Sequence, residues 1–217
     1  MPWRFLNVAS KAFVKQRLDL QVEGLEHVPK TGPVLIAARH FHHLYDGCAV
    51  IATVPRPCHV LVALDWVSNK PGRAAMEGVC RAARWPIVVR PGGPGAAGPA
   101  KAAAAFRAAA RDCLDLWREQ RILLVFPEGY PNVDPGYTPK LNEEEFLPFQ
   151  IGYLRLVELA QRQGMQVPIV PAGLSYERGI RWQVKLRFGT PVFIDTYPRK
   201  VDAAREIEAQ VGKLSSD

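Results

Sequence analysis

Two short runs of this chain are apolar without interruption, Val-Leu-Ile-Ala-Ala at residues 34–38 and Ile-Leu-Leu-Val-Phe at residues 122–126. A strand with one face in water alternates apolar and polar residues, whereas a strand covered by helices on both faces is apolar throughout. An Ala-rich segment with helical periodicity, residues 100–119, directly precedes the second run. We therefore predict an α/β protein with a mixed, mostly parallel central sheet flanked by helices.

The remaining elements follow from the same kinds of pattern. Further strands are predicted at residues 18–22, 59–64, 85–89, 168–174 and 182–188. Further helices are predicted at residues 44–53, 72–84, 149–163 and 201–214. Segments rich in turn-forming residues predict loops at 91–99 and 130–148. The 217 residues show no internal repeat or interdomain linker, so a single domain with a full core is expected.

Residues 1–17 combine aromatic and cationic side chains. Trp3, Leu6 and Phe13 share one side of a helix, and no acidic residue precedes Asp19. This composition is typical of a helix that lies in a membrane interface. It also fits an amphipathic helix that docks on the core of its own protein. We expect residues 1–17 to form an amphipathic, membrane-contacting helix and residues 18–217 to form the folded domain.

The formal net charge of +7 predicts an anionic partner. No run of four or more Lys or Arg residues occurs, so a membrane surface is favoured over nucleic acid. No apolar stretch reaches the roughly 18–20 residues that cross a bilayer, and the charged N-terminal segment does not fit a signal peptide. The four cysteines lack CxxC spacing, which is typical of reduced cytoplasmic thiols. We expect a cytoplasmic protein held peripherally on the inner face of the membrane.

Three of the five histidines, His40, His42 and His43, lie shortly after the first apolar run, and Asp46 follows them. Imidazole titrates near neutrality, so a histidine held by a carboxylate can act as a general base. Neutral imidazoles beside a carboxylate can also bind a metal ion. The cluster alone leaves a base, a metal ligand and a structural residue open.

Two other predicted strands are followed by residues suited to binding a ligand. Arg90 follows one of them, and Glu128 and Gly129 follow the other. In open α/β sheets, ligands bind beyond the carboxyl ends of the strands. We therefore expect His40, Arg90 and Glu128 to converge on one crevice.

The order of these segments resembles the glycerolipid acyltransferases, specifically the 1-acyl-sn-glycerol-3-phosphate acyltransferase family. That family has a strand followed by His, four residues and Asp-Gly, then an arginine at a strand end, then Phe-Pro-Glu-Gly, and then a Val-Pro-Val-Val-Pro-like strand. This chain has the four corresponding segments in the same order, and they end near Asp46, at Arg90, at Gly129 and at Pro171. The resemblance spans residues from about 20 to 190 and implies a glycerol-3-phosphate acyltransferase-like fold.

The resemblance implies transfer of a fatty acyl group from acyl-CoA or acyl carrier protein to the free hydroxyl of lysophosphatidic acid or a related lysolipid, as in phospholipid biosynthesis. His40 would be the general base and Asp46 would hold its ring. Arg90 would bind the acceptor's phosphate, and Glu128 would accept from a glycerol hydroxyl or orient Arg90. Gly129 would allow the backbone to approach the ligand closely. No metal ion or other cofactor is implied.

The chain departs from the family pattern in two places. His40 stands six positions before Asp46 and His42 stands four, where the family spacing is five. We predict His40 as the base from its position after the strand, with His42 as the alternative because i and i+4 meet on a helix face. The family's Thr-Arg-Ser after Phe-Pro-Glu-Gly is replaced by Tyr-Pro-Asn at residues 130–132. Arg90 would therefore carry more of the anion binding.

Two other functions stay open at this point. A metal-dependent hydrolase would use His40, His42, His43 and Asp46 as zinc ligands. Against it, Asp46 lies later than in an HxHxDH motif, and the C-terminal half of the chain has no histidine to complete a site. A non-catalytic lipid-binding protein would keep the same fold without the chemistry.

Overall fold

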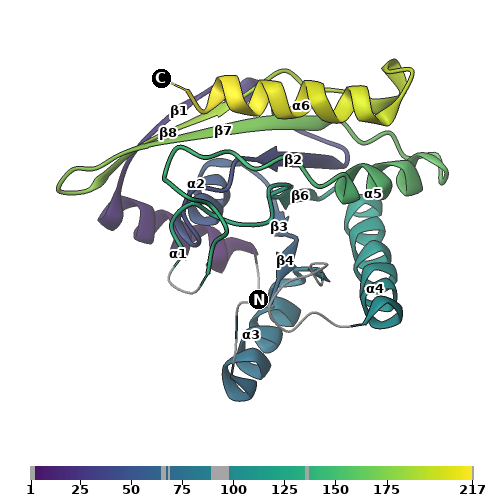
Figure 1. Ribbon diagram of the computed structural model, residues 1–217, viewed down its shortest axis with the longest axis horizontal. Helices are drawn as coiled ribbons and strands as arrows, with labels where there is room; N and C mark the ends of the chain where they lie inside the picture. Colours follow the sequence, from purple (N-terminus) through teal and green to yellow (C-terminus); the bar gives the residue numbers. More distant parts are fainter. Residues whose placement is uncertain (1–2, 65–66, 68, 89–97, 135–136, 217) are drawn as a thin grey trace.

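A six-stranded sheet with the strand order β1-β8-β7-β2-β6-β3 forms the centre of the molecule (Figure 1). The computed structural model describes residues 3–64, 67, 69–88, 98–134 and 137–216. The strands of this sheet are β1 (Leu18–Glu23), β2 (Val34–Ala38), β3 (Cys58–Val60), β6 (Ile122–Val125), β7 (Ile169–Glu177) and β8 (Trp182–Phe188). Within it β7 and β8 are antiparallel, and the other neighbouring strands are parallel. The predicted mixed, mostly parallel sheet is confirmed.

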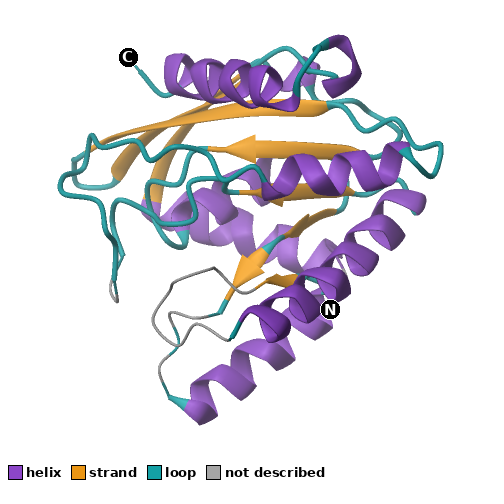
Figure 2. Ribbon diagram, turned by 45° about the vertical axis from the view of Figure 1, so that its right-hand side comes forward, coloured by secondary structure: helices purple, strands orange, loops and turns teal. Residues whose placement is uncertain are grey.

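Helices cover both faces of this sheet (Figure 2). One face carries α1 (Trp3–Arg17) and α2 (Tyr45–Thr53), and the other carries α4 (Pro99–Arg118), α5 (Gly152–Gln161) and α6 (Lys200–Leu214). In β2, Val34, Ile36 and Ala38 belong to the first hydrophobic core. Leu35 and Ala37 belong to the second. A core on each face is the physical reason for the uninterrupted apolar run in this strand.

The carboxyl ends of the three central strands meet at one edge of the sheet. Ala37 of β2 lies beside Val125 of β6 and Pro171 of β7, and all three strands are parallel. The residues that directly follow β2 and β6 therefore emerge side by side. Strand β7 continues to Glu177, past the predicted end at residue 174, and carries Tyr176 to the same edge.

The strands predicted at 59–64 and 85–89 differ from the prediction in their extent and in their partners. The segment at 59–64 is divided into β3 and β4 (Val62–Ala63), and the segment at 85–89 is shortened to β5 (Ile87–Val88). In the described part of the chain, β4 and β5 pair with each other in a separate two-stranded sheet, near α3 (Lys70–Ala83) (Figure 1). The ladder between β3 and β6 ends at Val60 and Leu124, and beyond it the N–H of Val62 donates to the carbonyl oxygen of Pro86 instead, at 2.9 Å. The prediction that the strand before Arg90 joins the central sheet is wrong.

Helix α1 packs against α2 and leaves part of its surface exposed. The ring of Phe13 meets the ring of Tyr45 edge to face, with centroids 5.4 Å apart, and Val14 is buried in the core. Phe5 and Val8 are 60% and 65% exposed. The helix predicted at residues 1–17 thus docks on the protein and also presents apolar side chains to solvent. Among the residues with a described position, no helix is long and apolar enough to cross a membrane.

Candidate active site

The turn between β2 and α2 is folded around the carboxylate of Asp46. Its Oδ2 accepts the backbone N–H groups of Phe41 at 2.7 Å and His42 at 2.9 Å, and Nδ1 of the His40 ring lies 2.9 Å from the same oxygen. Asp46 stands in the first turn of α2 and is fully buried. A short acidic side chain readily holds a turn through nearby backbone N–H groups. The local sequence therefore brings the ring of His40 to this carboxylate.

The ring of His40 is held on one side and open on the other. With the carboxylate as acceptor, Nδ1 is the protonated nitrogen. The ring stacks on Phe126 with centroids 4.2 Å apart, and the side chain is 13% exposed. Within the described residues, no hydrogen bond from Nε2 is found. A ring in this state can take a proton from a hydroxyl at Nε2 while the carboxylate stabilises the imidazolium.

Tyr176 supports the carboxylate from the other side. Its hydroxyl donates to Oδ1 of Asp46 at 2.5 Å, so both carboxylate oxygens are held by the protein. Burial and the nearby Asp46 raise the pKa of this phenol well above its usual value, which keeps it a hydrogen-bond donor. The sequence prediction missed Tyr176. The alternation of Ala172, Leu174 and Tyr176 on one face of β7 was the available signal.

His42 is placed differently from His40. Its ring stacks almost parallel on the ring of Tyr45, with centroids 3.7 Å apart, and its buried Nδ1 has no hydrogen-bond partner in the described part of the chain. Burial lowers the pKa of this imidazole, and the negative charge of Asp46 opposes the shift. The backbone of His42, rather than its ring, reaches Asp46. Of the two candidate bases, His40 is the one whose ring bonds to the carboxylate.

Glu128 lies under the same turn and is 2% exposed. Its Oε1 accepts the backbone N–H of His40 at 2.8 Å, and its Oε2 accepts the N–H of Leu147 at 3.0 Å and the ammonium of Lys140 at 2.6 Å. The carboxylate therefore connects the β2–α2 turn with the long loop before α5. Gly129 follows with a φ of +80°, a conformation that favours glycine.

The long loop at residues 126–151 also packs directly on the turn. Val133 donates its N–H to the carbonyl oxygen of Phe41 at 2.7 Å and accepts the N–H of His43 at 3.2 Å. Lys140, from the same loop, is fully buried at its side chain. Burial lowers the pKa of its ammonium, and the carboxylate of Glu128 opposes that shift. Sequence reasoning predicted a loop here and missed Lys140, because no local pattern marks a lysine for burial.

The model of the acyltransferase family matches residues 19–175, which contain His40, Asp46 and Glu128. The chain belongs to the acyltransferase family. The resemblance read from the order of the motifs is thereby confirmed. No curated protein sequence matches the chain.

The fold of this acyltransferase is also found in a solved structure. The crystal structure of the 1-acyl-sn-glycerophosphate (LPA) acyltransferase, PlsC, from Thermotoga maritima superposes with a TM-score of 0.67 at 16% sequence identity. The match covers 97% of this chain and 77% of that one. At this identity the likeness shows a shared fold, and it confirms the predicted fold class.

Two further sequence predictions concern Arg90 and a metal ion. Arg90 lies outside the described residues, so its place near His40 stays a prediction. Among the described residues of this acyltransferase, no group of three or more His, Cys, Asp or Glu side chains is arranged to hold a metal ion. The ring of His42 stacks on Tyr45 instead of turning to Asp46, so the four residues of the hydrolase hypothesis do not converge as ligands.

Proposed function

We propose that this protein transfers a fatty acyl group from acyl-CoA or acyl carrier protein to the free hydroxyl of lysophosphatidic acid or a related lysolipid. The observation that carries the proposal is the 2.9 Å contact between Nδ1 of His40 and Oδ2 of Asp46. A histidine oriented in this way suits a reaction in which a substrate hydroxyl must become a nucleophile. Membership of the acyltransferase family supports acyl transfer as that reaction.

In the proposed mechanism, Nε2 of His40 takes the proton of the lysolipid hydroxyl as its oxygen attacks the thioester carbonyl carbon. The carbon–oxygen bond forms and a tetrahedral intermediate results. The intermediate collapses with cleavage of the carbon–sulfur bond, and the leaving thiolate takes the proton back from His40. Asp46 stabilises the imidazolium between the two proton transfers. No side chain of the protein is acylated, and no metal ion or other cofactor takes part.

Arg90, Glu128 and Gly129 are the proposed substrate-binding residues. Arg90 would form a bidentate pair with a phosphate of the acceptor. Glu128 would serve the acceptor indirectly, through the backbone of His40, because its side chain is fully buried and both of its oxygens accept hydrogen bonds from the protein. Gly129 would let the backbone approach the ligand.

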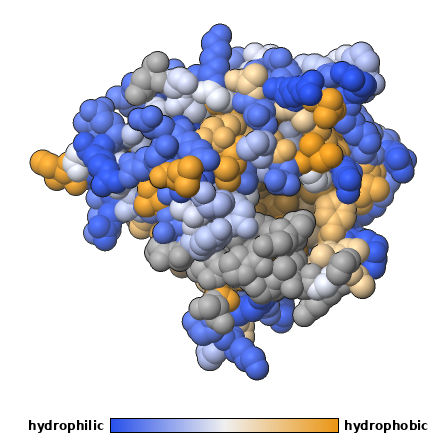
Figure 3. Space-filling view, in the orientation of Figure 1, coloured by the Kyte–Doolittle hydropathy of each residue, from blue (hydrophilic) through white to orange (hydrophobic). Residues whose placement is uncertain are grey.

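The surface offers an apolar region for the acyl chain. On the face seen in Figure 3, orange side chains border one side of a hollow near the middle, beside the grey atoms. A fatty acyl chain gains free energy when its methylene groups leave water, about 0.8 kcal/mol for each. We propose that the chain of the donor or acceptor lies in this hollow.

The proposed site of action is the inner, cytoplasmic surface of the membrane, which the protein would contact peripherally. Phe5 and Val8 on α1 are exposed, and the same helix carries Arg4, Lys11 and Lys15. Apolar and cationic residues on one helix favour an anionic lipid surface, and nucleic acid is not an expected partner. Replacing Phe5 and Val8 by serine should reduce sedimentation with anionic vesicles, and undiminished sedimentation would refute this membrane contact.

The direct test of the activity is incubation of the purified protein with acyl-CoA or acyl carrier protein and a panel of lysolipids. The expected result is a diacyl product, identified by mass, that forms in the presence of a metal chelator. Absence of product with every donor and acceptor would contradict the proposal and favour a non-catalytic lipid-binding protein. Stoichiometric zinc together with loss of activity in chelator would favour the metal-dependent reaction.

A further inference from the structure

A completely buried ion pair lies beside His40. The side chains of Lys140 and Glu128 are both 0% exposed, and Nζ of Lys140 is 2.6 Å from Oε2 of Glu128. The ammonium also donates to Oδ1 of Asn132 at 2.9 Å and to the backbone carbonyl oxygen of His40 at 3.0 Å. An ammonium has three N–H donors, so all three are used inside the protein.

The ion pair holds the backbone of His40 from both sides. Glu128 accepts the N–H of His40 at 2.8 Å, and Lys140 donates to its carbonyl oxygen at 3.0 Å. The ring of the same residue is held by Asp46. Both peptide groups that flank the α-carbon of His40 and one ring nitrogen are thus fixed by charged side chains.

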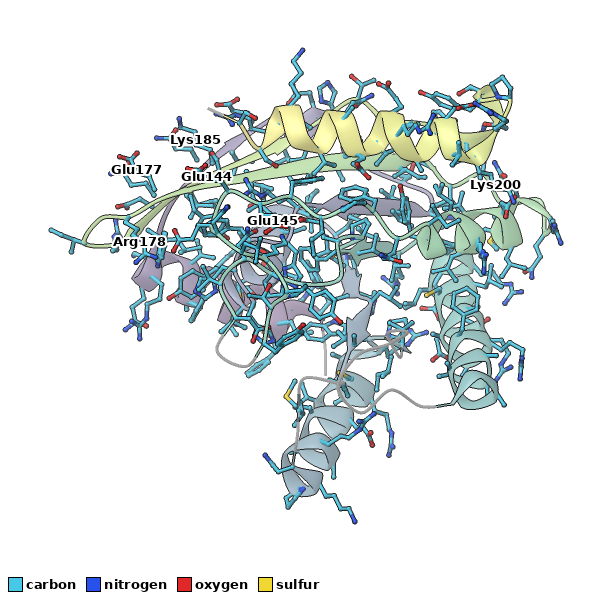
Figure 4. All side chains as sticks on the ribbon, in the orientation of Figure 1. Glu144, Glu145, Glu177, Arg178, Lys185 and Lys200 are labelled. Carbon is cyan, nitrogen blue, oxygen red and sulfur yellow. The ribbon has the colours of Figure 1, made fainter. Side chains whose placement is uncertain are left out.

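Asn132 keeps Lys140 in this place. Its side-chain oxygen accepts from Lys140, and its Nδ2 donates to the carbonyl oxygens of Asn142 at 3.1 Å and Glu145 at 2.8 Å. Figure 4 labels Glu145 on this loop. Asn132 stands where the chain departs from the family's Thr-Arg-Ser, so the departure supplies the amide that supports this lysine.

Stability does not explain such a pair well. Two buried charges lose their hydration, and apolar residues of the same volume often stabilise a fold equally well. A role in fixing geometry explains it better, because a shift of about 1 Å in a catalytic group can cost about 100-fold in rate.

We propose that Lys140 is a positioning residue for the reaction proposed above, on which this inference rests. It holds the backbone of His40 so that the ring stays between Asp46 and the substrate hydroxyl. Because Lys140 is fully buried, it acts through His40 and touches neither substrate. Its loss should therefore lower kcat and leave KM for both substrates almost unchanged.

The test compares Lys140→Met with the double variant Lys140→Met/Glu128→Gln. Lys140→Met leaves the Glu128 carboxylate buried without its partner and should lower Tm. The double variant removes both charges and should recover Tm. We expect kcat to fall about 100-fold in both, since neither can donate to the carbonyl of His40. Lys200→Met is the matched control, because Lys200 is exposed, pairs with Glu158, and lies at the right-hand edge in Figure 4, away from Glu145 on the loop.

A double variant that recovers both Tm and kcat would overturn the inference, since Lys140 would then serve stability alone. A second readout does not depend on activity. The Nδ1 proton of His40, bonded to Asp46, should give a downfield NMR signal in the wild type and in Lys200→Met and lose it in the double variant. An unchanged signal in the double variant would also overturn the inference. A wild type that shows the signal without acyl transfer would instead contradict the proposed function.

Discussion

The end of β2 and the end of β5 are both predicted to supply site residues, and they lie in different surroundings. All five residues of β2 are buried, and the turn that follows is bonded to two buried carboxylates, Asp46 and Glu128. β5 has two residues, both partly exposed, in a separate two-stranded sheet. Strand β2 is therefore held by a neighbouring strand on each side, whereas β5 pairs with β4 alone in the described part of the chain. Changes in the first region should lower kcat and stability, and changes in the second should raise KM.

The largest expected effect in the first region comes from Asp46→Asn. The amide cannot accept the three N–H groups that converge on Oδ2, nor stabilise an imidazolium by charge. We expect kcat to fall by about three to four orders of magnitude and the free energy of unfolding to fall by about 3 kcal/mol. Initial rates and urea unfolding measure the two quantities. An active, equally stable variant would show that the negative charge of Asp46 is needed neither for the turn nor for the reaction.

Tyr176→Phe should have a smaller effect in the same region. It removes the hydroxyl that donates to Oδ1 of Asp46. We expect kcat to fall about tenfold and the free energy of unfolding to fall by about 2 kcal/mol, typical for a hydrogen bond to a charged group. Tyr153→Phe is the control, because the buried hydroxyl of Tyr153 has no hydrogen-bond partner among the described residues. Equal losses in the two variants would argue against a special role for Tyr176.

Arg90→Ala tests the second region, which is the end of β5. If Arg90 pairs with the acceptor's phosphate, KM for lysophosphatidic acid should rise about tenfold while kcat changes less than about threefold. A monoacylglycerol acceptor, which has no phosphate, should show no change in KM. An equal rise in KM for both acceptors would remove phosphate recognition from this residue.

The smallest effect is a pH dependence of stability from two histidines, the half-buried His42 and the buried His59. Burial lowers the pKa of His42 and of His59, whose Nδ1 lies 3.1 Å from the carbonyl oxygen of Ala83. Below the ordinary histidine pKa of about 6.5 the unfolded chain binds more protons than the folded one. Stability is therefore complete above that pH and should fall by about 1 kcal/mol between pH 7.5 and 5.5.

Chemical unfolding at the two pH values measures this loss, and His59→Gln should reduce it. A rise in the free energy of unfolding on acidification would contradict the burial of neutral imidazoles in the folded protein.

The central sheet and the contact between His40 and Asp46 could be predicted from the sequence because their signals are local. Uninterrupted apolar runs predicted β2 and β6. The position of His40 directly after β2 predicted its contact with Asp46, although the two residues are six positions apart instead of five. The contacts of Tyr176 and Lys140 could not be predicted, since they join residues 130 and 100 positions apart in the chain. Such contacts depend on the register of whole strands and on the path of a long loop.

The pairing of β4 with β5 was missed for a related reason. Apolar residues at 60–64 predicted one strand, but where a strand changes partner depends on which segments the whole fold places beside it. Here Leu61 still donates to Leu124 of β6 and Val62 already donates to Pro86, a change that no pattern within 59–64 records.

The most direct test of the account is acyl transfer by His40→Ala and His42→Ala under saturating donor and acceptor, with the product identified by mass. We expect a fall in kcat of about 1,000-fold or more for His40→Ala and a change below about threefold for His42→Ala, with both proteins folded. Full activity in His40→Ala together with loss in His42→Ala would contradict the assignment of the base.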